Sequence, residues 1–209
     1  MLQFTKENFH SICDELASKD KCLKQVLIEY SYPPFWTRPN TFETLVLTIL
    51  EQQVSLASAY AAYKKLKELT TNITPHSVLA LRDEELRSCY FSRQKIIYVR
   101  EVANAIESKQ IDLKRFETED DIIVRKELTA LKGIGDWTVD IYLIHALKHS
   151  DVLPLGDLAL VNAVRMIRGE PLTKEEILEL SNRWKPYRSI ATMMYWHYYI
   201  KKKNIKLLH

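Results

Sequence analysis

The chain has 209 residues, 46% of them hydrophobic, which is enough to bury a sizeable core in one large domain or two small ones. The formal net charge of +3 excludes little by itself, but the charge is unevenly distributed. No acidic residue follows Glu179. The basic residues beyond it are Arg183, Lys185, Arg188, Lys201, Lys202, Lys203 and Lys206. Such a basic surface is typical of proteins that contact a polyanion, although residues 201–206 could equally be a solvated tail.

The three cysteines, Cys13, Cys22 and Cys89, lack the spacing of metal ligands. We therefore expect neither a zinc site nor a four-cysteine iron–sulfur cluster. The sequence has no signal peptide and no long apolar run, which predicts a protein without a membrane segment. Free thiols favour a reducing compartment, so we expect a cytoplasmic protein.

Apolar residues recur with a helical period along the chain, and no segment shows the strict alternation of a strand. Residues 31–40 form a proline-rich connector with an extended backbone. Thr41, Ser55, Thr74 and Ser92 are cap residues that mark the starts of helices. We expect helices at about 4–18, 21–30, 41–52, 55–69, 76–81, 83–89, 92–108, 118–131, 136–149, 158–167, from 173 onward and at 187–203. The sequence therefore predicts an all-α protein.

Three of the four glycines lie close together, at Gly133, Gly135 and Gly156. Glycine is needed where φ is positive or where another group approaches the backbone closely. One helix ends before Gly133 and the next begins at Asp136, which predicts a helix–hairpin–helix with Ile134 plugged into the core. The glycine amides and the first N–H groups of the second helix would form a site suited to a phosphate. An ordinary tight turn between two helices is the alternative interpretation.

Four blocks of sequence resemble the helix–hairpin–helix (HhH-GPD) DNA glycosylase superfamily and, within it, the AlkA-like branch, 3-methyladenine DNA glycosylase II. The blocks occur in the family's order and cover most of residues 40–200. They read FETLV at 42–46 with ILEQQVS at 49–55, LKGIGDWT at 131–138, LPLGDLAL at 153–160, and WKPYRS at 184–189 with YW at 195–196.

The resemblance implies two helical subdomains with an active-site cleft between them and no N-terminal β domain. Residues 40–155 would make the central domain, with the helix–hairpin–helix at about 120–149. Residues 1–39 and 156–209 would make the second domain from both termini. The implied partner is damaged double-stranded DNA, bound by a monomer without a cofactor.

Asp157 matches the family's catalytic aspartate, which implies that it stabilises an oxocarbenium ion, activates water, or does both. The alternative is a plain N-cap of the helix that begins at Leu158. Trp137 stands where the strand-cutting members carry a lysine, so the resemblance implies a monofunctional glycosylase without AP-lyase activity. Trp137 and Trp196, with Ile141 and Leu158, match the base pocket. Core packing is the alternative for either tryptophan.

The resemblance also assigns DNA contacts. Gln53 matches the residue that fills the gap left by the flipped base, and Gln52 precedes it. The hairpin residues expected to contact DNA are Lys132, Gly133, Ile134, Gly135, Asp136 and Thr138. No catalytic metal is expected, but the carbonyls of Lys132, Gly133 and Gly135 could hold a structural monovalent cation. For Asp140 and His145 we expect capping or surface roles rather than catalysis.

The implied substrates are N-alkylated purines of the 3-methyladenine and 7-methylguanine type, whose removal leaves an abasic site. Ile141 and Leu158 replace tyrosines of the best-known relative, which leaves substrate range open. One alternative is a glycosylase for a deaminated or oxidised base. Another is a non-catalytic hairpin protein that only binds DNA, and a third is a helical adaptor for other proteins.

Overall fold

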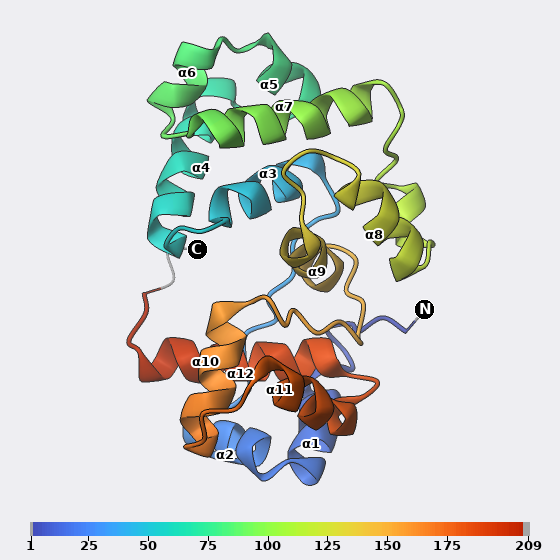
Figure 1. Cartoon of the computed structure of the whole chain (residues 1–209), viewed down its shortest axis with the longest axis vertical. Coiled ribbons are helices and arrows are strands. Elements are labelled where there is room, and N and C mark those ends of the chain that lie inside the picture. Colours follow the sequence, from blue (N-terminus) through green and yellow to red (C-terminus); the bar gives the residue numbers. More distant parts are fainter. Residues whose placement is uncertain (1, 207–209) are drawn as a thin grey trace. The chain divides into compact units, whose positions relative to one another are not determined.

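In the computed structural model, which describes residues 2–206, these residues form twelve α-helices and two short 3₁₀ helices without any strand (Figure 1). The prediction of an all-α fold is confirmed. None of the helices in this part of the chain is long and apolar enough to cross a membrane. By their internal contacts the described residues form two compact units, one of residues 2–37 with 143–206 and the other of residues 38–142. One border between the units falls between residues 142 and 143, within the helix α9 (Asp136–His145). The resemblance instead implies a border near residue 155.

The unit of residues 38–142 is organised around α3 and α7, which pack against each other, with α4 packed on α3 and with α5 and α6 packed on α7. Caps begin these helices as expected: the Thr41, Ser55 and Ser92 side chains each accept from the N–H three residues on. The helices are α3 (Phe42–Glu51), α4 (Leu56–Thr70), α5 (Pro75–Ala80), α6 (Asp83–Ser88), α7 (Arg93–Glu107), a 3₁₀ turn (Arg115–Glu117) and α8 (Asp121–Thr129).

The helix α9 (Asp136–His145) crosses the border between the two units. It ends at His145 rather than near 149, because residues 146–147 turn and Lys148 has a left-handed backbone with a φ of +57°. The chain then pairs with the N-terminal segment. His149 forms a β-bridge with Gln3, and the N–H of Phe4 donates to the carbonyl of Lys148 at 3.0 Å. The helix α8 also differs from the prediction, since it begins at Asp121 rather than at 118.

The unit made from both termini is built around α12 (Arg188–Lys202), which packs against α1, α2 and α10 (Figure 1). The side chains of α12 are buried from Ser189 through Tyr198. Because α12 is buried on all sides, its polar side chains can hold their hydrogen-bond partners in fixed positions. The other helices are α1 (Phe9–Lys19), α2 (Lys21–Tyr30), α10 (Leu158–Arg168), α11 (Lys174–Leu180) and a 3₁₀ turn (Ser181–Trp184).

Candidate functional site

The hairpin between α8 and α9 needs glycine at Gly133 for two reasons. Its φ is +87°, which disfavours any residue with a Cβ, and an added Cβ would lie 2.1 Å from the ring of Tyr98 on α7. Ile134, the next residue, is 4% exposed. The expected plug beneath the turn is therefore present, and Gly133 allows the turn to press directly on an aromatic ring.

Gly135 is different, because no atom lies within 4 Å of the position that its Cβ would take. Packing among the described residues therefore does not require a glycine there. Gly135 leads directly into α9, whose first N–H groups have no carbonyl one turn earlier to bind. Its backbone is exposed at the positive end of a helix, where an anionic group can approach closely.

Arg125 of α8 ties the two hairpin helices together. Its guanidinium pairs with Asp136 at 3.1 Å and with Asp140 at 2.6 Å. Asp140 is 7% exposed, so the expectation of a surface or capping role is wrong for this residue. Burial raises the pKa of Asp140 to about 6, and the neighbouring Arg125 offsets only part of that effect. No local sequence pattern could reveal this pairing, since the partners lie 11 and 15 residues from Arg125.

The end of α3 is attached to the hairpin through Gln52. Its Nε2 donates to the carbonyl of Gly133 at 3.0 Å and to the hydroxyl of Thr138 at 2.9 Å. Gln53 instead has an exposed side chain and a φ of +57°. Of the two glutamines predicted to contact DNA, Gln52 thus points into its own unit and Gln53 points to solvent.

The carbonyls of Lys132, Gly133 and Gly135 are the predicted ligands of a monovalent cation, and two of these three accept hydrogen bonds within the protein. Gly133 accepts from Gln52, and Gly135 accepts from the N–H of Val139 at 3.2 Å. A carbonyl oxygen has two lone pairs, so a cation ligand role stays a prediction. Among the described residues there is also no group of three His, Cys, Asp or Glu side chains that could hold a metal ion.

Asp157 lies at the start of α10, where its Oδ1 accepts from the N–H of Leu160 at 2.8 Å. The same oxygen accepts from the indole Nε1–H of Trp196 on α12 at 2.9 Å. The first bond is the N-cap that the sequence suggested as an alternative role. The second bond is not part of any helix cap, and it fixes the orientation of the carboxylate. Two N–H donors, one from the first turn of α10 and one from α12, therefore bind the same carboxylate oxygen.

The indole of Trp196 is held on its face as well as at its N–H. The ring of His145 stacks on it, with centroids 5.5 Å apart and planes 12° from parallel. His145 Nδ1 in turn lies 2.7 Å from the carbonyl of Trp36. His145, for which the sequence suggested a capping or surface role, is partly exposed and packs on the indole of Trp196. Trp196 itself is 9% exposed.

The other predicted site residues lie in different environments. Trp137 is half-buried on α9, one turn before the buried Ile141, and both belong to the unit of residues 38–142. Leu158, in the unit of Asp157, is 73% exposed. Lys132 and Asp136 of the hairpin have exposed side chains, and Thr138 is buried. The structure therefore brings together Asp157 and Trp196, and separately Gln52, Gly133 and Thr138.

A family model described as HhH-GPD superfamily base excision DNA repair protein matches residues 46–186, and the chain belongs to this family. The chain is 32% identical over 168 residues to DNA-3-methyladenine glycosylase 1 of Schizosaccharomyces pombe, covering 76% of this chain and 72% of that protein. It is 26% identical over 196 residues to DNA-3-methyladenine glycosylase of Bacillus subtilis, of whose length it spans 65%.

Solved structures give the same result. The Schizosaccharomyces pombe 3-methyladenine DNA glycosylase Mag1, in complex with abasic DNA, superposes with a TM-score of 0.83 at 28% identity, covering 92% of this chain and 97% of Mag1. A DNA-3-methyladenine glycosidase from Bacillus halodurans superposes with a TM-score of 0.77 at 29% identity, covering 98% and 95%. The resemblance of the four sequence blocks to the HhH-GPD superfamily is confirmed, and the relatives named here are 3-methyladenine DNA glycosylases.

Proposed function

We propose that this protein is a monofunctional base-excision-repair DNA glycosylase that removes N-alkylated purines and leaves an abasic site. The observation that carries the proposal is the Asp157 carboxylate, held at the start of α10 by Leu160 N–H and by the Trp196 indole. The names of the relatives, several of which are DNA-3-methyladenine glycosylases, support the substrate class.

The chemistry requires a fixed negative charge. A base inside a duplex is inaccessible, so the target nucleotide is flipped out before the bond from its sugar C1′ to the base nitrogen breaks. Bond breaking leaves positive charge on the deoxyribose, which the Asp157 carboxylate stabilises. The same carboxylate orients or deprotonates the water that attacks C1′. N-alkylated purines are cationic and leave readily, so no strong general acid is needed.

DNA binding would fall to the hairpin and to the loop after α3. The exposed backbone of Gly135 and the first N–H groups of α9 suit a backbone phosphate. The exposed Gln53 suits the gap left by the flipped base. Mag1, a relative at 28% identity, is described in complex with abasic DNA, which supports DNA as the partner.

Trp137 would define the type of glycosylase. An indole cannot form the Schiff base through which lysine-bearing relatives cut the strand, so the product is an intact strand with an abasic site. Stacking of a cationic alkylpurine on such a ring would add roughly 1–2 kcal/mol. Trp137 is half-buried, so part of its surface is accessible for such a contact.

The first experiment is base release from methylated duplex DNA, with free bases separated by chromatography and the strand checked for nicks. We expect free 3-methyladenine or 7-methylguanine without nicking. Asp157→Asn should reduce the release rate by about 10²-fold or more while DNA binding is retained. Asp112→Asn is the matched control, since Asp112 also caps a turn, by accepting from Lys114 N–H at 2.9 Å. Near-normal release by Asp157→Asn would overturn the catalytic role.

Two other outcomes would change the assignment. Release of a deaminated or oxidised base, with no release of a methylated one, would leave a glycosylase with a different substrate. The exposed Leu158 and the buried Ile141 replace tyrosines of the best-known relative. Duplexes with deaminated or oxidised bases should therefore be tested beside the methylated duplex. DNA binding with no base release from any substrate would indicate a binding protein.

A further inference from the structure

The segment from His149 to Asp157 carries the proposed catalytic carboxylate, yet it is neither helix nor strand. Within it, short turns are closed by Leu155 N–H to Leu153 O at 2.9 Å and by Asp157 N–H to Pro154 O at 2.8 Å. An irregular segment has considerable conformational freedom, and fixing each residue has an entropic cost. Something outside the segment must therefore hold it.

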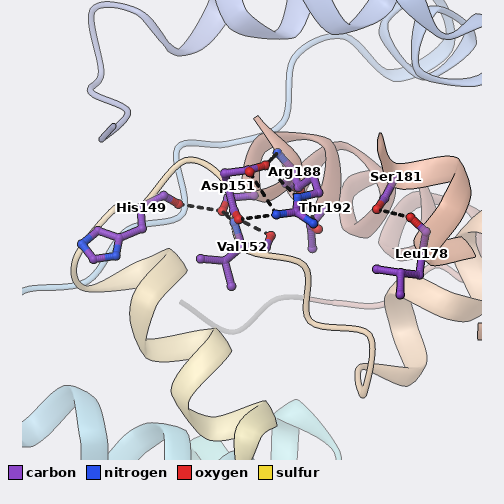
Figure 2. A network of polar contacts seen from close by, with 8 residues as sticks. His149, Asp151, Val152, Leu178, Ser181, Arg188 and Thr192 are labelled. Carbon is purple, nitrogen blue, oxygen red and sulfur yellow. Dashed lines mark hydrogen bonds and ion pairs between the residues drawn. The ribbon is translucent and has the colours of Figure 1, made fainter. Parts of the chain in front are cut away.

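The beginning of the segment is held by the first turn of α12 (Figure 2). Arg188 donates from Nε to Asp151 Oδ1 at 2.7 Å and from a terminal nitrogen to Oδ2 at 2.9 Å. The Ser189 hydroxyl donates to the carbonyl of His149 at 2.6 Å and accepts from the N–H of Val152 at 3.0 Å. Two neighbouring side chains thus bind both the side chain and the backbone of this turn.

The end of the segment is held by the same helix two turns later. Trp196 Nε1 donates to Asp157 Oδ1 at 2.9 Å. Arg188 and Trp196 are eight residues apart, which places them on one face of α12 and about 12 Å apart along its axis. Because α12 is buried along most of its length, the two attachment points are fixed relative to each other.

We propose that Arg188 and Trp196 are positioning residues, which together hold Asp157 in its reactive orientation by attaching both ends of the segment 149–157 to α12. This inference rests on the proposed function only for its catalytic consequence. Arg188 acts through Asp151, and Trp196 acts on the carboxylate itself. A displacement of a catalytic group by about 1 Å can cost about 10²-fold in rate, so a remote ion pair can matter for turnover.

The test uses Arg188→Gln and Trp196→Phe, each beside a matched control. Trp184→Phe is the control for Trp196→Phe, because Trp184 Nε1 also donates to a carboxylate, Asp20, at 2.9 Å. Arg100→Gln is the control for Arg188→Gln, because Arg100 also holds a loop, through the carbonyl of Leu81 at 2.6 Å and through Asp83 at 3.0 Å.

The first measurement needs no enzymatic activity. Amide hydrogen exchange by NMR should accelerate at Leu160 in both test variants and at Val152 in Arg188→Gln, but at neither residue in the controls. The indole N–H resonance of Trp196, assigned through Trp196→Phe, should shift in Asp157→Asn. Thermal unfolding of all four variants shows whether the losses of stability are comparable.

The second measurement is single-turnover base release, with affinity for abasic-site duplex measured in parallel. Both test variants should slow release by about tenfold or more while the affinity stays within about twofold, and the controls should release base at the wild-type rate. Unchanged exchange at Leu160, or equal slowing by the controls, would overturn the positioning role. Absence of base release by the wild-type protein would instead contradict the proposed function, while the exchange data would still decide the positioning.

Discussion

The side-chain amide of Gln52 donates to the backbone carbonyl of Gly133 at 3.0 Å, although 81 residues separate them in sequence. The same amide also reaches Thr138 in the first turn of α9. One side chain at the end of α3 therefore holds both the hairpin and the helix that follows it. The geometry of the proposed phosphate site depends on this connection, since the amides that would bind phosphate lie between these two contacts.

Replacement of Gln52 by alanine should destabilise the protein by about 1–2 kcal/mol, because two polar groups of the hairpin lose their partner. The adjacent Gln53→Ala serves as the control, and its exposed side chain should leave stability within about 0.5 kcal/mol. Urea unfolding measures both. Equal effects of the two substitutions would contradict the structural role of Gln52.

The two hairpin glycines should respond in opposite ways to alanine. Gly133→Ala places a Cβ against the ring of Tyr98 and strains a φ of +87°, so the free energy of unfolding should fall by about 2 kcal/mol or more. Gly135→Ala meets open space, so stability should be retained while affinity for duplex DNA falls. Unfolding curves and binding isotherms separate the effects. Unchanged DNA affinity in Gly135→Ala would argue against close approach of phosphate at that backbone.

Asp140 predicts a pH dependence of stability. Its pKa is raised from 3.8 to about 6 by burial, so the folded protein keeps this proton to a higher pH than the unfolded chain does. This contribution to stability is therefore present below about pH 4 and is lost as the pH rises through about 6. The free energy of unfolding of Asp140→Asn, relative to that of the wild type, should rise by about 2 kcal/mol between pH 4 and 7. Urea unfolding of both proteins across this range provides the measurement, and a constant difference would disprove the shift.

Trp137→Lys should not produce strand cleavage. A lysine forms a Schiff base only when its amine is deprotonated and correctly placed, and a half-buried tryptophan site is not built to lower a lysine pKa. Borohydride treatment in the presence of abasic DNA would trap any such intermediate. A trapped covalent complex would show that the tryptophan alone prevents lyase activity.

Much of the fold follows from local rules and could be predicted. A helix begins where a Thr or Ser side chain can accept from an N–H three residues on, as at Thr41, Ser55 and Ser92. The hairpin was predictable because only glycine tolerates the backbone that Gly133 adopts. The family blocks placed Asp157 at the start of a helix, and that position depends only on neighbouring residues.

The sequence alone could not decide which distant residues form hydrogen bonds with these side chains. Trp196 lies 39 residues from Asp157, and His145 meets the carbonyl of Trp36 across 109 residues. Beyond the end of α9, His149 likewise pairs with Gln3 near the start of the chain. Caps and turns are determined by atoms a few residues apart, so the sequence by itself determines where they occur. Buried polar groups must instead find partners wherever the packed helices bring them, so only the tertiary structure decided which side chains hold the carboxylate and the hairpin.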